Sequence, residues 1–271
     1  MKNFSDKINS KNIEIFIKKF IYKTNSKETE VLKNISISIP KGQICGIVGP
    51  SGCGKSTLIK IILDLLKPSD INHFEGEIAI FGKKPLDARI GREFSYIPQD
   101  SLLFPWWNVI ENTILPLKIS DISIDDKKIN ALKILENVGL GCFANSSINE
   151  LSVGMKKRVS IARAMVSCRK LMLLDEPLAS LDELVREEIG MILQKLWYEH
   201  DTTAIMVSHD LSETVFFCDR VIVLSHRPSR VIEDIIINLP RPRKFDHKTL
   251  PEFFNALKVI RKTLSKNSKD N

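Results

Sequence analysis

One stretch of the sequence decides how the rest is interpreted: Gly49-Pro50-Ser51-Gly52-Cys53-Gly54-Lys55-Ser56-Thr57. It matches the pattern G-x-x-x-x-G-K-[ST], in which glycines let successive backbone N–H groups converge on phosphate oxygens. Lys55 is placed to bridge the β- and γ-phosphates of a nucleotide, and the Ser56 hydroxyl is a candidate ligand for Mg²⁺. An apolar run at residues 44–48 predicts a strand buried on both faces, and a helix is expected from Ser56 to about Leu66. The stretch is therefore predicted to bind a nucleotide.

Two carboxylates follow a second apolar run much later in the chain. Residues 171–174 are Leu-Met-Leu-Leu, and Asp175 and Glu176 come directly after them. Asp175 is expected to hold Mg²⁺ through water, while Glu176 points to the other side and can polarise the attacking water. Alone, such a pair is often only a strand end with solvated charges. Together with the phosphate loop it predicts a site that hydrolyses a nucleotide.

The composition excludes several protein classes. The 271 residues are 43% hydrophobic, which is enough for a packed core and too much for a disordered chain. No stretch approaches the roughly 18 uninterrupted apolar residues of a spanning helix, and the first residues lack the apolar run of a secretory signal. The five cysteines are widely spaced without a Cys-x-x-Cys pair, which argues against a zinc site or a disulfide framework. We expect a soluble intracellular protein.

The net charge of +7 is concentrated at the end of the chain. Residues 241–271 contain nine basic and three acidic residues. A binding face for nucleic acid is not predicted, because its basic footprint should spread over a surface. Apolar residues at 250, 253, 254, 257, 260 and 264 are spaced as in an amphipathic helix. This tail is either solvated and packed on the domain surface or in contact with anionic lipid headgroups.

The order of apolar patterns predicts one α/β domain at residues 12–240, followed by the basic tail. Residues 12–40 predict two short strands around a polar turn at 25–28, and further strands are expected at 77–81, 94–97, 171–174, 204–207 and 221–224. Between Gln99 and Ser152 the pattern is mostly helical, most clearly at 129–138. A helical subdomain at about residues 100–165 is therefore expected inside the α/β domain.

Further motifs, taken in order, resemble those of the ATP-binding subunits of ABC transporters over roughly residues 12–240. Leu151-Ser152-Val153-Gly154-Met155 is similar to the family signature Leu-Ser-Gly-Gly-Gln, and Ala179-Ser180-Leu181-Asp182 is similar to its D-loop. Val207-Ser208-His209-Asp210 resembles the switch segment, and Gln99 occupies the Q-loop position. The resemblance implies an α/β P-loop NTPase with a RecA-like core of mostly parallel sheet, an antiparallel β subdomain and an inserted helical subdomain.

The resemblance also implies a mechanism. Two copies would pair head to tail and enclose ATP between the phosphate loop of one and the signature of the other, where Ser152 and the Gly154 N–H meet the γ-phosphate. Glu176 would act as base or water orienter, and His209 would contact the γ-phosphate. Gln99 would link Mg²⁺ to the membrane partner. Asp182 would communicate across the dimer.

The implied site has three sets of residues. Phe20 would stack on adenine, with Tyr22 as the alternative. The catalytic set is Lys55, Gln99, Glu176 and His209. The nucleotide-binding set is Phe20, Gly49, Pro50, Ser51, Gly52, Cys53, Gly54, Lys55, Ser56, Thr57, Ser152, Gly154 and Asp182. The metal set is Ser56, Gln99 and Asp175, and the implied cofactors are ATP and Mg²⁺.

Two signature positions depart from the family. Met155 replaces the glutamine, and Val153 replaces the first glycine. A β-branched residue resists a positive φ and adds bulk near a phosphate. We nevertheless expect an ATPase, because Ser152 and Gly154 are retained.

A finer resemblance concerns the transporter branch. Residues 99–112, with Pro105-Trp106-Trp107, and the segments 218–228 and 239–243 are similar to nitrate/sulfonate/taurine-type importers. They imply a peripheral subunit on the cytoplasmic face of the inner membrane, working with permease subunits and indirectly with an external solute-binding protein. The two tryptophans are either part of a groove for a permease helix or part of the core.

Two other functions fit some of these residues. A soluble ABC-type ATPase acting on DNA or ribosomes usually carries long coiled coils or tandem ATPase domains, which this sequence lacks. A regulatory protein that binds a nucleotide without hydrolysing it is favoured only by Val153 and opposed by Lys55, Glu176 and His209. The predicted function is therefore the ATPase of an importer.

Overall fold

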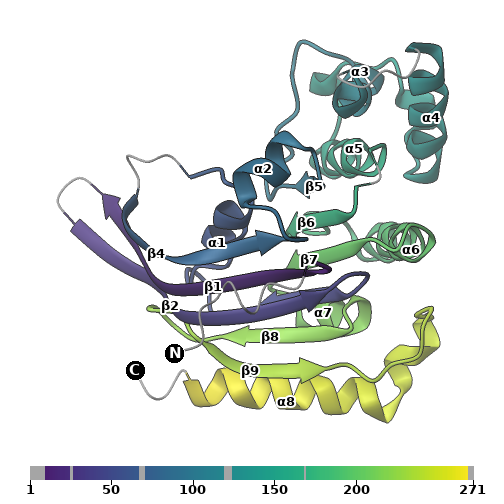
Figure 1. Ribbon diagram of the computed structural model, residues 1–271. Coiled ribbons are helices and arrows are strands. Elements are labelled where there is room, and N and C mark those ends of the chain that lie inside the picture. Colours follow the sequence, from purple (N-terminus) through teal and green to yellow (C-terminus); the bar gives the residue numbers. More distant parts are fainter. Residues whose placement is uncertain (1–9, 25–26, 67–70, 119–123, 168, 268–271) are drawn as a thin grey trace. The chain divides into compact units, whose positions relative to one another are not determined.

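The computed structural model describes residues 10–24, 27–66, 71–118, 124–167 and 169–267 (Figure 1). It divides into two units. The first is formed by the chain up to Glu93 together with the chain from Thr203 onward, and the second is Phe94–Thr202. Each unit has its own strands and helices.

The first unit contains a three-stranded antiparallel sheet in the order β2-β1-β4. Its strands are β1 (Asn12–Thr24), β2 (Lys27–Pro40) and β4 (Ile71–Ile80), followed by the helix α2 (Pro85–Ile90). The strands predicted as short are 13 and 14 residues long, and β4 begins six residues before the predicted Glu77. Polar residues in the first half of β4 hide it from an apolar pattern, but β1 pairs with it as far as Tyr22 and Ile71.

The same unit contains four strands of a second sheet, in the order β7-β3-β8-β9. They are β3 (Ile44–Val48), β7 (Thr203–Val207), β8 (Arg220–Leu224) and β9 (Val231–Ile236). β3 is parallel to both β7 and β8, and every residue of β3 and β7 is buried. Such strands carry no alternating polar face, in agreement with the predicted central strand. β9 is antiparallel to β8 and was not predicted, because Glu233 and Asp234 interrupt its apolar pattern.

Helices of the first unit surround these strands: α1 (Lys55–Ile62), α7 (Leu211–Phe217), the short η6 (Phe245–Thr249) and α8 (Pro251–Asn267). α1 ends earlier than the predicted Leu66, and Asp64 just beyond it has a left-handed φ of 54°. α8 buries Phe253, Leu257 and Ile260 and packs on α7, β8 and β9 (Figure 1). The amphipathic helix of the tail therefore covers a surface of its own unit.

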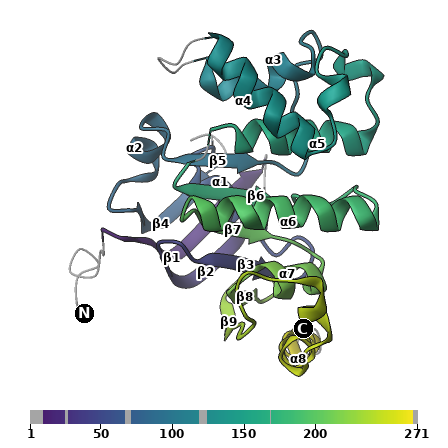
Figure 2. The same ribbon diagram turned by 90° about the vertical axis from the view of Figure 1, so that its right-hand side faces the viewer.

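The second unit pairs β5 (Phe94–Ile97) with β6 (Leu171–Asp175) in parallel. Its helices α3 (Val109–Ile114), α4 (Ile124–Asn137) and α5 (Val153–Met165) form a cluster (Figure 2). The long helix α6 (Glu183–Glu199) buries Trp197, whose Nε1 donates to Met172 Sδ of β6 at 3.4 Å. The short helices η3 (Leu115–Leu117), η4 (Gly141–Phe143) and η5 (Ile148–Glu150) connect these elements. Among the described helices, none has the length and hydropathy to cross a membrane.

Gly46 sets how closely α7 approaches β3. A Cβ atom at Gly46 would lie 2.9 Å from Cys218 Sγ and closer still to Thr214 Cγ2. Thr214 and Cys218 lie on α7 and at its C-terminal end, and α7 directly follows the turn that contains the predicted switch residue His209. Glycine is required here for space.

We expect Gly46→Ala to lower the free energy of unfolding by about 1–3 kcal/mol, because the added methyl group overpacks the contact between β3 and α7. Urea denaturation measures this change. Gly154→Ala is the matched control, since a Cβ there meets Ser180 O at an ordinary 3.6 Å. If Gly46→Ala and the wild type have the same free energy of unfolding, α7 can move away from β3 without loss of stability.

Candidate active site

The phosphate loop joins the buried strand β3 to α1, and its backbone requires glycine. Gly52 and Gly54 have φ values of 72° and 118°, which L side chains rarely adopt. A Cβ at Gly54 would also lie 2.7 Å from Val31 Cγ1. The predicted residues 49–57 therefore form a curled loop that ends at the start of a helix. This conformation suits phosphate oxygens, which accept hydrogen bonds from converging backbone N–H groups.

Lys55, the first residue of α1, is directed back into this loop. Its Nζ donates to Gly49 O at 2.8 Å and to Pro50 O at 3.0 Å. Cys53 Sγ lies 4.0 Å from the same ammonium, and the Cys53 side chain is buried. The ammonium is therefore held inside the loop, where the lysine of the pattern G-x-x-x-x-G-K-[ST] contacts the terminal phosphates of a nucleotide.

The connection between β8 and β9 fastens the far side of the loop. Arg227 Nε donates to Gly52 O, and the fully buried Ser229 donates from Oγ to Cys53 O. The sequence analysis used this segment only as a marker of the transporter branch. The structure shows that it contacts the phosphate loop. No pattern in one sequence reveals this contact, which joins residues about 175 positions apart.

His209 follows β7, which runs parallel to β3 with Val207 opposite Ile47. Because parallel strands end at the same edge, the His209 turn and the phosphate loop lie at one edge of this sheet. The turn is braced: the Ser208 hydroxyl accepts from Asp210 N at 3.1 Å, and the Asp210 carboxylate accepts from Glu213 N at 3.1 Å at the start of α7. His209 itself is exposed.

In the second unit, Gln99 and the Asp175-Glu176 pair come from the ends of the parallel strands β5 and β6. Ile97 pairs with Leu174, so the Gln99 loop and the two carboxylates lie at one edge. Asp175 is buried and Gln99 is exposed. Burial, and then the negative charge of Asp175, raise the pKa of Tyr96 to about 12. Asp175 is thus a buried oxygen donor of the kind that Mg²⁺ prefers.

Glu176 has an unusual backbone conformation. Its φ is 50°, and Ser180, four residues later, has a φ of 68°. Non-glycine residues in this left-handed region carry a cost of order 1 kcal/mol and concentrate at functional sites. Glu176 is half-buried and starts the turn that leads to α6. Sequence reasoning named the residue but not this strain.

Ser152 and Asp182 each cap a helix. The Ser152 side chain accepts from Met155 N at 3.2 Å at the start of α5, and Asp182 accepts from Val185 N at 3.1 Å at the start of α6. Serine and aspartate are favoured there because they satisfy an unpaired N–H of the first turn. Both residues therefore have a structural role besides the implied functional one.

The expected strain at Val153 is absent. Val153 is the first residue of α5 with a negative φ, and its side chain is 70% exposed. The concern about a positive φ was therefore wrong, because a helix begins one residue after Ser152. At Gly154 a Cβ would meet only ordinary contacts, at 3.6 Å to Ser180 O and 3.7 Å to Leu181 Cδ2. Nothing within the described unit requires glycine at this position.

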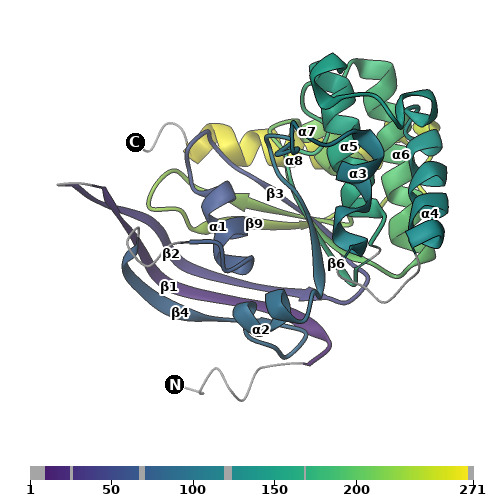
Figure 3. The ribbon, with the colours of Figure 1, turned by 90° about the horizontal axis from the view of Figure 1, so that it is seen from above.

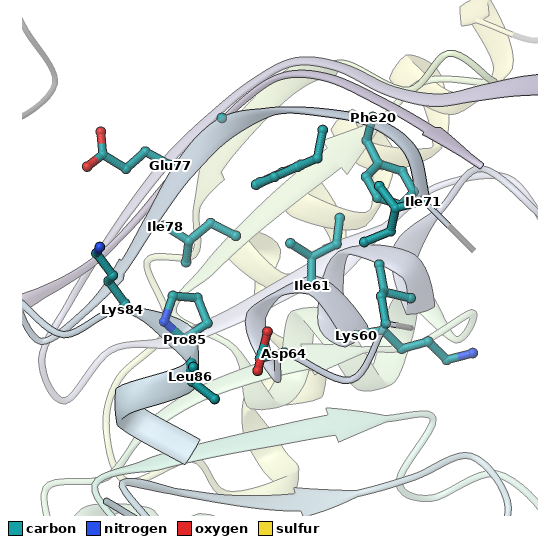
Figure 4. A pocket seen from close by; sticks show the side chains of 13 residues that line it. Phe20, Lys60, Ile61, Asp64, Ile71, Glu77, Ile78, Lys84, Pro85 and Leu86 are labelled. Atoms are coloured by element: carbon teal, nitrogen blue, oxygen red, sulfur yellow. The ribbon is translucent and has the colours of Figure 1, made fainter. Parts of the chain in front are cut away.

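Phe20, the implied adenine-stacking residue, is fully buried. Its ring points into a cavity of about 500 Å³ between β1, β4 and α1, near Ile61 and Ile71 (Figure 4). Tyr22, the alternative aromatic residue, is half-buried and meets the Phe20 ring edge-on at 4.9 Å. The stacking role of Phe20 stays a prediction.

Sequence reasoning missed two basic residues of α5 that hold the Gln99 loop. The buried Lys157 donates from Nζ to Pro98 O at 2.8 Å and to Gln99 O at 2.9 Å. Arg163 donates to Leu102 O at 2.9 Å and Ser101 O at 3.0 Å, and burial lowers its pKa. Since α5 begins at the signature, these bonds tie the signature helix to the Gln99 loop.

We expect Lys157→Met to lower the free energy of unfolding by about 1–3 kcal/mol, because it leaves two carbonyl groups of the Gln99 loop without their donor. Urea denaturation measures the loss. Lys156→Met, a change at the neighbouring half-buried lysine, is the control and should stay close to the wild type. If the two variants unfold alike, Lys157 does not hold the loop.

Comparisons with known proteins identify the family of the chain. Residues 32–179 match the family model described as ABC transporter. The aliphatic sulfonates import ATP-binding protein SsuB 3 of Pseudomonas savastanoi pv. phaseolicola is 42% identical over 215 residues, which cover 79% of this chain and 74% of that protein. The aliphatic sulfonates import ATP-binding protein SsuB of a Bacillus cereus strain is 37% identical over 230 residues, covering 84% of this chain and 88% of that protein.

Solved structures give the same result. The dimeric post-hydrolysis state of the ATP-binding cassette MJ0796, bound to ADP and Pi, aligns with a TM-score of 0.74 at 31% identity. The alignment covers 83% of this chain and 98% of that one. The fold is thus the predicted P-loop NTPase fold. The chain belongs to the ABC transporter family, as an ATP-binding and ATP-hydrolysing subunit that uses Mg²⁺.

Proposed function

We propose that this subunit powers the import of a small organic anion of the sulfonate class through a partner permease. The observation that carries the ATPase part is the phosphate loop, with Lys55 directed into it and the His209 turn at the same edge of the sheet. The substrate class rests on the names of the relatives, which are aliphatic sulfonate import proteins in Pseudomonas and Bacillus.

Each predicted residue has a role in this proposal. The loop residues 49–57 bind the phosphates, and Lys55 neutralises the terminal ones. Ser56 and Asp175 supply oxygen ligands for Mg²⁺, with Gln99 close to the metal. When bound, Mg²⁺ would supply positive charge beside the phosphate oxygens around the bond that breaks. The oxygen donors fit this ion, which is usually held by one or two carboxylates and the substrate phosphates.

The reaction is the hydrolysis of ATP to ADP and phosphate. Glu176 orients a water molecule and accepts its proton while the water oxygen bonds to the γ-phosphorus. The bond from that phosphorus to the oxygen bridging to the β-phosphate breaks, and ADP leaves. His209 donates a hydrogen bond to the γ-phosphate as negative charge shifts. The strained φ of Glu176 supports its assignment to this step.

The signature belongs to the second copy of the chain in this proposal. Ser152 and the Gly154 N–H of one copy contact the γ-phosphate held by the other, and Asp182 acts across the dimer. Gly154 supports this, because its lack of a side chain has no explanation within its own unit. Val153, which lies between Ser152 and Gly154, has a side chain that is 70% exposed.

Two variants distinguish the binding of ATP from its hydrolysis. We expect Lys55→Ala to abolish ATP binding, because it removes the cation at the terminal phosphates. Glu176→Gln should bind ATP, lose more than about 100-fold in turnover, and form a stable ATP-bound dimer. Calorimetry, phosphate release and size-exclusion chromatography measure these effects. Undiminished turnover in either variant contradicts the assignment, and an unchanged oligomeric state of Glu176→Gln with ATP favours a non-hydrolysing regulator.

The permease is proposed to dock beside the Gln99 loop, on the cytoplasmic face of the membrane. Phe104 packs against both Trp106 and Trp107, with ring centroids 5.3 Å and 4.8 Å away. Trp106 is 72% exposed, whereas Lys118 Nζ lies 3.8 Å from the Trp107 ring centroid. An exposed tryptophan on a packed aromatic base suits an interface. An external solute-binding protein would deliver the anion to this permease.

We expect Trp106→Ala to lower association with membranes several-fold while ATP affinity stays unchanged, because the exposed ring supports no core. The measurement is sedimentation with membranes prepared from the source cells, beside calorimetry with ATP. Phe143→Ala, at another exposed aromatic residue of the same unit, is the control. If membrane binding survives the loss of Trp106, the permease docks elsewhere. If the wild-type subunit does not sediment with membranes, ribosome or DNA binding becomes the function to test.

A further inference from the structure

The C-terminal helix reaches the phosphate loop. A cavity of about 340 Å³ is lined by six residues: Gly49, Pro50, Leu211, Arg261, Leu264 and Ser265. The first two begin the phosphate loop, and Leu211 follows the switch histidine by two residues. The last three belong to the C-terminal half of α8, which passes the connection between β3 and α1 (Figure 3). All six lie in the first unit, so the cavity is a feature of that unit.

α8 holds this position through its apolar face. Phe253, Leu257 and Ile260 are buried against its own unit, and they alternate with exposed residues at helical spacing. Arg261 directly follows the fully buried Ile260, so its backbone is fixed beside the loop. When an anion arrives, only the Arg261 side chain and not its backbone has to be ordered.

Arg261 brings a charge that none of the described residues neutralises. From Phe253 to Asn267 the helix has four basic residues and no acidic one. Arg261 is exposed at the cavity and, within residues 10–267 as far as they are described, has neither an ion pair nor a hydrogen bond from its side chain. A guanidinium group is well suited to phosphate because it donates several hydrogen bonds in one plane.

The cavity lies at the end of the loop that serves the terminal phosphate. Lys55, which bridges the β- and γ-phosphates in this motif, donates to the carbonyl groups of Gly49 and Pro50. These same two residues line the cavity with Arg261. A triphosphate held by the loop therefore presents its outermost charge toward the guanidinium group.

We propose that Arg261 is a further ATP-binding residue, which contacts the terminal phosphate from the C-terminal helix. The inference rests on the proposed function of the phosphate loop, and it assigns part of the basic tail to that site. A lysine or arginine near a helix C-terminus can instead serve the helix dipole. Lys262 separates the two explanations, because it has the same place in the helix but lines a different hollow with Ile232 and Glu233.

The test is isothermal titration calorimetry of the full-length subunit with Mg²⁺, using a non-hydrolysable ATP analogue and, separately, ADP. We expect Arg261→Ala to bind the ATP analogue about tenfold more weakly and ADP within about twofold of the wild type. Arg261→Lys, which keeps the charge, should recover part of the loss, and Lys262→Ala should match the wild type. Circular dichroism checks that α8 stays folded.

Three results would overturn the inference: unchanged affinity for the ATP analogue in Arg261→Ala, an equal loss in Lys262→Ala, or an equal loss for ADP. Lys55→Ala separates this failure from a failure of the proposed function. If Lys55→Ala abolishes binding while Arg261→Ala is unchanged, only the role of Arg261 is refuted. If Lys55→Ala still binds the analogue, the phosphate loop itself has been assigned incorrectly.

Discussion

The parallel pairing of β3 with β7 on one side and β8 on the other is the constraint on which the nucleotide site depends. Each of these strands ends at the same edge, and each is followed by a segment of the site: the phosphate loop, the His209 turn and the Arg227–Ser229 connection. The pairing requires strands without polar faces, which β3 and β7 satisfy. It also requires α7 to lie close to β3, which the missing side chain of Gly46 permits.

The second unit holds its functional segments together with different bonds. These segments are the Gln99 loop, the carboxylates after β6 and the start of α5. Lys157 and Arg163 join the first of these to α5 through backbone carbonyl groups, so the connection does not depend on the side chains of the loop. A displacement of the Gln99 loop by a docked permease would therefore be transmitted to α5 directly.

The chemistry of the site could be predicted from residue types at fixed spacing, because phosphate and Mg²⁺ demand particular groups. Strand 94–97 was predicted at its observed bounds. The prediction of secondary structure failed where tertiary contacts, and not the local sequence pattern, determine the conformation. Glu233 and Asp234 hid β9, and the polar first half of β4 hid its start. The negative φ of Val153 follows from its place as the first residue of α5. The partners of Arg227 and Lys157 lie too far along the chain for any local pattern.

The position of α8 has a practical use that the motifs alone do not suggest. Ser265 is exposed and lines the cavity beside Gly49 and Pro50, so a dye attached through Ser265→Cys would sense nucleotide arrival optically. Of the cysteines that the structure describes, Cys45, Cys53 and Cys218 are buried and Cys142 is exposed. Replacing Cys142, together with Cys168, which lies outside the described residues, would direct labelling to the new position. The subunit would then become a fluorescent reporter of its own ATP cycle.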